Sequence, residues 1–211
     1  MNDQQTRRRR RVPALAPDER RAALVAATLP LLRTHGAAVT TRQIAEAAGV
    51  AEGTIFGVFP DKASLIAAAL ESAFDAGPML RALSAIDPQA PLRERLSDAT
   101  AILIRRVESS VPLMMLARTM PFDAEDSPLA ALLRGRRRLI EAVAELIEPD
   151  RAQLRRSPDT TAGVLFALVA STVRGDLPTE KPFTPDEIVA VLLDGLLRRT
   201  DTEHDQNRGE A

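Results

Sequence analysis

The chain has 211 residues, of which 45% are hydrophobic, 27% charged and 3% aromatic, so it can bury a sizeable core. Its content of Ala, Leu, Arg and Glu, with few aromatic and scattered β-branched residues, favours helices and predicts no sheet. The absence of cysteine excludes disulfides and thiolate metal sites. No apolar run reaches the roughly 18 residues of a membrane span and no secretory signal is recognisable, so we expect a soluble cytoplasmic protein.

The net charge of −1 conceals an uneven distribution along the chain. Residues 1–64 hold ten Lys and Arg against six Asp and Glu, whereas residues 65–211 hold eighteen against twenty-three. Five adjacent arginines, residues 7–11, make up half of the basic residues in the first segment. Such a run either follows a polyanion or only keeps the chain soluble, and the run alone does not decide between the two.

The first predicted helix follows a basic arm, residues 1–16, that we expect to be disordered. Pro17 with two acidic residues behind it is typical of a helix start, and Gly36 is expected to end this helix just after Thr34. Pro30 falls inside the helix, where a proline typically costs about 3 kcal/mol. Because the apolar stripe continues across it, we predict one kinked helix rather than two.

Two short helices joined by a tight turn are predicted next. Thr40 and Gln43 form a capping box at the start of the first, which ends at a glycine. After the turn, a second short helix is expected over residues 52–59. Asp61 then caps a longer helix that runs to about residue 76.

The pattern stays helical in the rest of the chain, with proline beside serine or threonine at several predicted starts. Helices are expected over residues 89–109, 111–119, 127–148, 157–174 and 184–199. The polar residues 200–211 are expected to form a disordered tail. The sequence therefore predicts an all-α protein.

The most informative stretch is residues 40–62, TTRQIAEAAGVAEGTIFGVFPDK. Its two short helices suit a helix-turn-helix, in which the first helix crosses the DNA phosphates and the second enters the major groove. Residues 17–70 resemble the DNA-binding domain of the TetR (tetracycline repressor) family in the order, spacing and type of these residues. The resemblance implies a helix-turn-helix DNA-binding domain over residues 17–64, followed by a larger helical ligand-binding and dimerisation domain over residues 65–199.

The resemblance also implies DNA contacts residue by residue. Thr41 is expected at a phosphate and Arg42 at guanine O6 and N7, with capping and a solvated charge as the alternative reading. Glu52 is a candidate acceptor from cytosine N4. Gly53 lets the backbone approach the duplex, and Thr54 can meet a phosphate or a thymine methyl group.

The last part of the motif contains both the clearest match and two departures. Lys62 resembles the family's phosphate-binding lysine at the start of a helix. Phe56 stands where the family typically has a tyrosine, so one phosphate hydrogen bond is lost, and Gly57 replaces a position that is often bulky and base-contacting. More of the specificity then falls to Arg42, to Glu52 and to a basic arm in the minor groove. The arm's candidate contacts are Arg8, Arg9 and Arg10.

One helix-turn-helix reads only a few base pairs, so we expect a homodimer on a palindromic, double-stranded DNA operator. The candidate interface lies on apolar stripes of the last two predicted helices. These stripes include Val164 and Val191, and the residues singled out on them are Val169, Val173, Ile188, Leu192 and Leu196. The same apolar stripes could instead be intramolecular core.

A soft group of side chains marks a candidate ligand pocket: Met114, Met115, Arg118, Phe122 and Phe166. Methionine adapts to varied shapes, and an arginine can orient an anionic group, although core packing explains the same residues equally well. The resemblance implies an effector, which we expect to be a small apolar molecule that releases a repressor from its operator. No cofactor and no metal site are indicated.

Two other classes of function were weighed against this one. The only histidines are His35 and His204, and there is no Gly-rich phosphate loop, so no enzyme is predicted. A helical architectural or scaffold DNA-binding protein without an effector is the alternative, which the sparse recognition helix favours. Salt-dependent binding without sequence preference would indicate that alternative.

Overall fold

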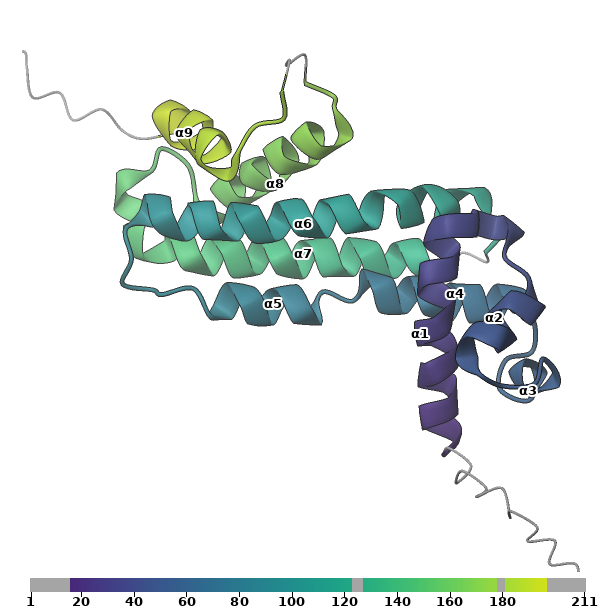
Figure 1. Ribbon diagram of the computed structural model, residues 1–211. Helices are drawn as coiled ribbons and strands as arrows, with labels where there is room; N and C mark the ends of the chain where they lie inside the picture. The colour runs from purple at the N-terminus through teal and green to yellow at the C-terminus, as the bar shows by residue number, and fades with distance from the viewer. Residues whose placement is uncertain (1–15, 123–126, 178–180, 197–211) are drawn as a thin grey trace, which may run out of the picture. The chain divides into compact units, whose positions relative to one another are not determined.

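The computed structural model describes residues 16–122, 127–177 and 181–196, and its regular elements are helices, as predicted (Figure 1). The chain divides into two compact units, Met1–Ala69 and Leu70–Ala211. The expected domain boundary after residue 64 thus falls inside the first unit, and the extent of the functional domains stays a prediction. The arm residues Arg8, Arg9 and Arg10 lie outside the described residues. None of the described helices is long and apolar enough to span a bilayer.

The N-terminal unit is built from short helices around a small core. Its elements are α1 (Pro17–His35), the 3-10 turn η1 (Gly36–Ala38), α2 (Thr41–Ala48), α3 (Gly53–Phe56) and the first part of α4 (Lys62–Phe74). Large apolar side chains of this unit are almost fully buried: Leu24, Leu32, Val39, Ile44, Ile55, Phe59, Leu65 and Ile66. The guanidinium carbon of Arg21 lies 4.3 Å from the centre of the Phe59 ring, so α1 also contacts the segment after α3.

Helix α1 runs without interruption through Pro30, as predicted, rather than as two helices. Two threonine hydroxyls in this region donate to carbonyls of the preceding turn. Thr28 Oγ1 donates to the Leu24 carbonyl at 2.8 Å, and Thr34 Oγ1 donates to the Pro30 carbonyl at 3.2 Å. Thr28 is fully buried, so this bond satisfies a hydroxyl that water cannot reach.

The C-terminal unit is a bundle of longer helices. Its elements, besides the end of α4, are α5 (Gly77–Ser84), α6 (Leu92–Thr119), α7 (Pro128–Ile147), the 3-10 turn η2 (Glu148–Gln153), α8 (Pro158–Arg174) and α9 (Pro185–Leu196). Helices α6 and α7 lie side by side, α5 packs against both, α8 also packs against both, and α9 packs on α6 and α8 (Figure 1). The apolar faces of these helices form one continuous buried core.

The two predicted helices over residues 89–109 and 111–119 are wrong, because α6 continues through Pro112 as one helix. Pro112 is exposed, and so is Glu108, whose carbonyl loses its partner at the proline. Water can therefore satisfy that carbonyl. Val107 and Leu113 are buried on the other side of the helix, and their packing offsets the loss.

Helix α5 was not predicted, since Gly77 and Pro78 were expected to end the preceding helix. Pro78 instead occupies the first turn of α5, where a missing N–H leaves no hydrogen bond unmade. The Gly77 N–H donates to Asp75 Oδ1 at 3.1 Å and stabilises the turn between the two helices. A proline after a helix thus starts the next one here.

Arg95 at the beginning of α6 is a buried residue whose guanidinium group has hydrogen-bond and ion-pair partners within the bundle. It is 5% exposed and donates to the carbonyls of Ala90, at 2.6 Å, and Leu146, at 3.2 Å. It also forms an ion pair with Asp150 in η2. A buried guanidinium needs such partners, so this contact holds the start of α6 against the end of α7.

Candidate DNA interface and ligand pocket

Helix α2 begins with the predicted capping box. The Thr40 N–H donates to Gln43 Oε1 at 2.8 Å, and the Gln43 N–H donates to Thr40 Oγ1 at 3.2 Å. The helix ends at Gly49, whose φ of +66° lies in the left-handed region that favours glycine. Ile44 and Ile55 are fully buried and hold α2 and α3 together.

Helix α3 is shorter than the helix predicted over residues 52–59. It comprises only Gly53–Phe56, and the chain continues in turns, with the Phe59 N–H donating to the Ile55 carbonyl at 2.8 Å. Gly57 has low helix propensity, and Pro60 follows closely, so the helix ends early. The recognition surface is therefore a single helical turn and its flanks.

The candidate DNA contacts lie at the surface of the N-terminal unit. Those that are exposed are Arg42, Glu52, Gly53, Phe56 and Gly57, and those that are partly exposed are Thr41, Thr54 and Lys62. Phe56 is 54% exposed although it is a large aromatic residue, while its neighbour Ile55 is fully buried. Single exposed apolar residues are common at protein surfaces, so the Phe56 ring is accessible to a partner but does not by itself mark a contact surface.

Thr41 and Glu52, predicted as separate DNA contacts, are bonded to each other. The Thr41 hydroxyl donates to Glu52 Oε1 at 2.5 Å and joins the first turn of α2 to the residue before α3. A hydroxyl has one proton, so Thr41 cannot donate to Glu52 and to a phosphate at the same time. Glu52 keeps lone pairs for a base amine. A phosphate can therefore accept from the Thr41 hydroxyl only if the bond to Glu52 is broken.

Helix α4 begins with an acidic cap and the candidate phosphate ligand. Asp61 Oδ1 accepts from the Ser64 N–H at 2.7 Å and from its hydroxyl at 2.8 Å, and these bonds lower the pKa of Asp61. The cap stabilises the unit above the ordinary carboxyl pKa, and this is lost as the pH falls through the lowered pKa. Lys62 Nζ donates to the Ala37 carbonyl at 3.1 Å, which leaves two N–H groups for a phosphate.

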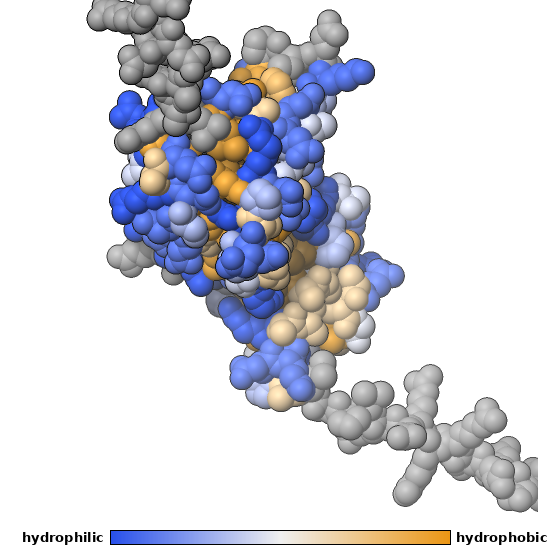
Figure 2. Space-filling view, turned by 90° about the vertical axis from the view of Figure 1, so that its left-hand side faces the viewer, coloured by the Kyte–Doolittle hydropathy of each residue, from blue (hydrophilic) through white to orange (hydrophobic). Residues whose placement is uncertain are grey.

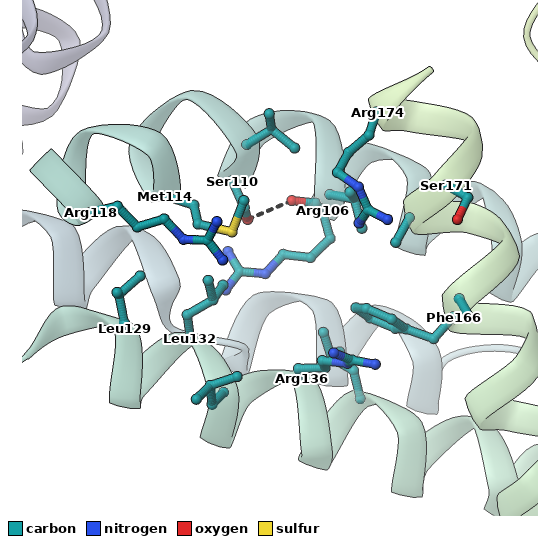
Figure 3. Close-up of a pocket in the computed structure, with 16 residues that line it drawn as sticks. Arg106, Ser110, Met114, Arg118, Leu129, Leu132, Arg136, Phe166, Ser171 and Arg174 are labelled. Atoms are coloured by element: carbon teal, nitrogen blue, oxygen red, sulfur yellow. Dashed lines mark hydrogen bonds between the residues drawn. The ribbon is translucent and has the colours of Figure 1, made fainter. Parts of the chain in front are cut away.

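A cavity of about 470 Å³ lies between α6, α7 and α8 of the C-terminal unit (Figure 3). Helix α6 lines it with a stripe spaced by four residues: Arg106, Ser110, Met114 and Arg118. Helix α7 contributes Leu129, Leu132, Leu133, Arg136 and Leu139, and α8 contributes Phe166, Ala167, Ala170, Ser171 and Arg174. The volume is typical of small-molecule sites. The described residues contain no group of three or more His, Cys, Asp or Glu that could hold a metal ion.

Three of the five predicted pocket residues line this cavity, namely Met114, Arg118 and Phe166. The other two do not. Met115 is 55% exposed because it lies one residue, and so about 100°, around α6 from Met114. Phe122 follows the end of α6, beyond the part of the helix that faces the cavity.

Three arginines that line the cavity were missed from the sequence: Arg106, Arg136 and Arg174. The signal for Arg136 was available, because it lies on one helical stripe with Leu132 and Leu139. Its guanidinium carbon lies 5.0 Å from the centre of the Phe166 ring. An arginine within an apolar stripe indicates that the stripe faces something other than a closed core.

Arg106 links the cavity wall to the end of α4. It is 6% exposed and donates to the carbonyls of Ala73, at 2.7 Å, and Phe74, at 2.6 Å, in the last turn of that helix. Burial lowers the pKa of Arg106, and the carboxylate of Asp75 partly opposes this shift. The Ser110 hydroxyl donates to the Arg106 carbonyl at 2.7 Å, as the dashed line in Figure 3 shows.

The structure corrects the predicted dimer interface. Val169, Ile188 and Leu192 are at most 2% exposed in the single chain, and the half-buried Val173 packs against the same core. The side chain of Leu196 lies outside the described residues. These stripes face the chain's own helices, since α9 packs on α6 and α8, so they are intramolecular core.

Other apolar side chains of the last two helices do reach the surface. Val164 on α8 is 39% exposed and Val191 on α9 is 54% exposed. Figure 2 shows one face of the molecule, on which apolar side chains come to the surface between hydrophilic ones. Exposed valines on two adjacent helices are available to a partner, unlike the buried members of the same stripes.

The N-terminal unit also has a family match. Residues 24–69, which include α2, α3 and their turn, match the sequence model of the bacterial regulatory proteins of the tetR family. The N-terminal unit is a TetR-family domain. TetR-family regulators bind DNA operators and work as dimers, so the exposed surface of α2 and α3 is the candidate DNA interface.

Solved structures share the fold of the whole chain. A putative TetR-family regulator from Mesorhizobium loti is 16% identical with a TM-score of 0.63, covering 88% of this chain and 100% of its own. A TetR regulator from Agrobacterium tumefaciens is 22% identical with a TM-score of 0.63, covering 86% and 96%. The superantigen PfiT is 20% identical with a TM-score of 0.62, covering 87% and 99%.

Identities this low show the TetR-like fold alone. No curated protein sequence matches the chain. The role of the C-terminal unit must therefore be argued from its own residues.

Proposed function

We propose that the chain is a transcriptional repressor that binds a palindromic DNA operator as a homodimer and leaves it when a small molecule occupies the cavity. The observation that supports DNA binding most directly is the exposed surface of α2 and α3, which carries Arg42 and Phe56 within the segment that matches the family. We propose DNA binding as the function of the chain and assign it no catalytic role.

The roles proposed for the individual DNA contacts follow from the chemistry of their side chains. Arg42, exposed in the first turn of α2, reads a guanine, and Lys62 meets a phosphate with the two donors that Ala37 leaves free. Phe56 offers an apolar face to a sugar or a thymine methyl group. The arginine arm adds contacts that depend on salt but little on sequence.

Helix α4 supports the proposed release from the operator. It is one continuous helix from Lys62 to Phe74. Its first residue, Lys62, is bonded to Ala37 in η1, and the carbonyls of its last two residues are bonded to Arg106 in the cavity wall. A ligand that prefers a different placement of Arg106 would act on α4, and a coupling of about 1–3 kcal/mol would weaken operator binding roughly 5- to 150-fold.

Selection of bound duplexes from a random pool tests this proposal, and we expect a palindromic consensus. Arg42→Ala should cost about 1–3 kcal/mol and relax one base position in each half-site. Lys62→Ala should instead weaken all sequences alike and reduce the salt slope by about one unit. Arg33→Ala on α1 is the charge-matched control and should change neither preference.

Two results would contradict the proposal. An Arg42→Ala protein with unchanged preference and affinity would remove the assigned base contact. Strong, salt-dependent binding without any consensus would favour the architectural alternative without an effector.

A further inference from the structure

All charged side chains among the described residues that line the cavity are positive. Four arginines line it, one or more from each of α6, α7 and α8, and none of the described lining residues is acidic. In Figure 3 the side chains of Arg118, Arg136 and Arg174 come from three different helices and extend toward the space between them. The sequence had indicated a single arginine in an otherwise apolar pocket.

Two of the four arginines are already paired. Arg106 donates to the two carbonyls that end α4, and Arg174 forms an ion pair with Asp176 at 2.7 Å. Arg118 and Arg136 form no ion pair with any acidic group among the described residues. The cavity therefore presents two guanidinium groups whose charge the described protein does not compensate.

The rest of the wall is apolar. It is formed by Val111, Met114, Leu132 and Leu139 from α6 and α7 and by Phe166 from α8. Inorganic phosphate would meet the arginines but leave this wall in contact with water. A neutral hydrocarbon would cover the wall but leave both guanidinium groups without a partner.

We propose that the effector of this chain is an amphiphilic anion, whose carboxylate or phosphate group is bound by the cavity arginines Arg118 and Arg136 and whose apolar body covers the apolar part of the cavity wall. This inference rests on the proposed function of the cavity as an effector site and replaces the small apolar molecule expected from the sequence. Arginine suits such a head group because its planar fork donates two hydrogen bonds to a carboxylate or phosphate. Arg136 is held in position by the Phe166 ring.

Helix α7 supplies a matched control within its own arginine run. Arg134, Arg137 and Arg138 are exposed like Arg136, but they do not line the cavity. An anion attracted only by the general charge of α7 would respond to the loss of any of them. Among these four arginines of α7, only the loss of Arg136 should weaken the binding of an anion that lies in the cavity.

Calorimetric titration of the full chain tests the proposal with probes that share one ten-carbon tail: decanoate, decyl phosphate, decanol and decyltrimethylammonium. We expect the two anions to bind and the other two to bind at least tenfold more weakly. Arg118→Gln and Arg136→Gln should each weaken anion binding about 10- to 100-fold, whereas Arg137→Gln should leave it unchanged. Comparison of decanoate with decyl phosphate decides which head group is preferred.

The outcomes separate this inference from the proposed function. If decanol binds as tightly as decanoate, or if the double variant Arg118→Gln, Arg136→Gln binds decanoate as the parent chain does, the charge class is wrong, whatever happens on DNA. If the anions bind in the cavity but operator affinity stays the same, the ligand class stands and the proposed release fails. Circular dichroism of each variant shows that weaker binding is not a loss of fold.

Discussion

The hydrogen bond between Thr41 and Glu52 gives the helix-turn-helix a polar contact for which DNA must compete. A phosphate can accept from Thr41 only after the hydroxyl has left the carboxylate. The same carboxylate repels the phosphates while it offers an acceptor to a cytosine amine. We therefore expect Glu52 to lower affinity for DNA in general and to favour the sequence that places a hydrogen-bond donor beside it.

Replacing Glu52 by alanine should separate these two effects. We expect Glu52→Ala to bind non-specific duplexes more tightly and to lose about 1–3 kcal/mol of discrimination at one base pair of each half-site. Competition binding with duplexes changed at single base pairs measures both quantities. Glu46→Ala on α2 removes the same charge from an exposed carboxylate and should keep the preference. Unchanged discrimination in Glu52→Ala would remove Glu52 from the base-reading set.

Sequence reasoning succeeded at this scale where the contact is local. The capping box of Thr40 and Gln43 was predictable because donor and acceptor lie three residues apart in one helical turn. The Thr41–Glu52 bond was not, since it joins residues eleven apart and exists only once α2 and α3 have packed through Ile44 and Ile55.

Among the elements, two of the wrong predictions are those in which proline was treated as a break. Pro112 lies inside α6, exposed on one side of a helix whose other side is buried along its length. Pro78 begins α5 instead of marking the end of α4. A proline inside a helix costs about 3 kcal/mol, whereas a proline in the first turn is tolerated. The packing of a long apolar face decides whether the helix forms in spite of that cost.

Helix α7 approaches the end of α4 so closely that a side chain at one glycine position would be crowded. A Cβ at Gly135 would lie 3.1 Å from the Phe74 carbonyl oxygen and 3.4 Å from the Ala76 Cβ. We expect Gly135→Leu to destabilise the chain by about 1–3 kcal/mol, because the added side chain would overpack this contact.

Gly163 in α8 is the control for that substitution, because a Cβ there would meet nothing within 4 Å. Gly163→Ala should stabilise the chain by about 0.5–1 kcal/mol through helix propensity. Thermal unfolding of both variants checks the pair, and equal effects at the two glycines would mean that the close approach at Gly135 is easily relaxed.

For the whole molecule, the sequence predicted the helical class, whereas the DNA-reading surface stays a prediction and several residues predicted for the partner surface are buried in the single chain. Apolar residues spaced by three and four mark a buried face without saying what covers it. In α9, Ile188 and Leu192 are covered by this chain's own α6 and α8. Only a three-dimensional arrangement of the helices could show that Val191, one residue away from Leu192, is the side chain that faces outward.

The proposed homodimer should therefore depend on Val164 and Val191 rather than on Leu192 and Leu196. We expect the double variant Val164→Asp, Val191→Asp to be monomeric, because two buried charges in each protomer would oppose association, and to keep its helical content, because neither side chain belongs to the core. The monomer should bind the palindromic operator far more weakly, since one helix-turn-helix contacts only one half-site. Sedimentation and operator titration measure the two effects, with Met115→Asp as a control on an exposed side chain of α6.

Leu192→Asp should instead lower the thermal stability of the chain, because Leu192 is 2% exposed in the core of the C-terminal unit. A double valine variant that sediments as a dimer would place the interface on another face, and the two helix-turn-helix heads would then be spaced by contacts other than α8 and α9.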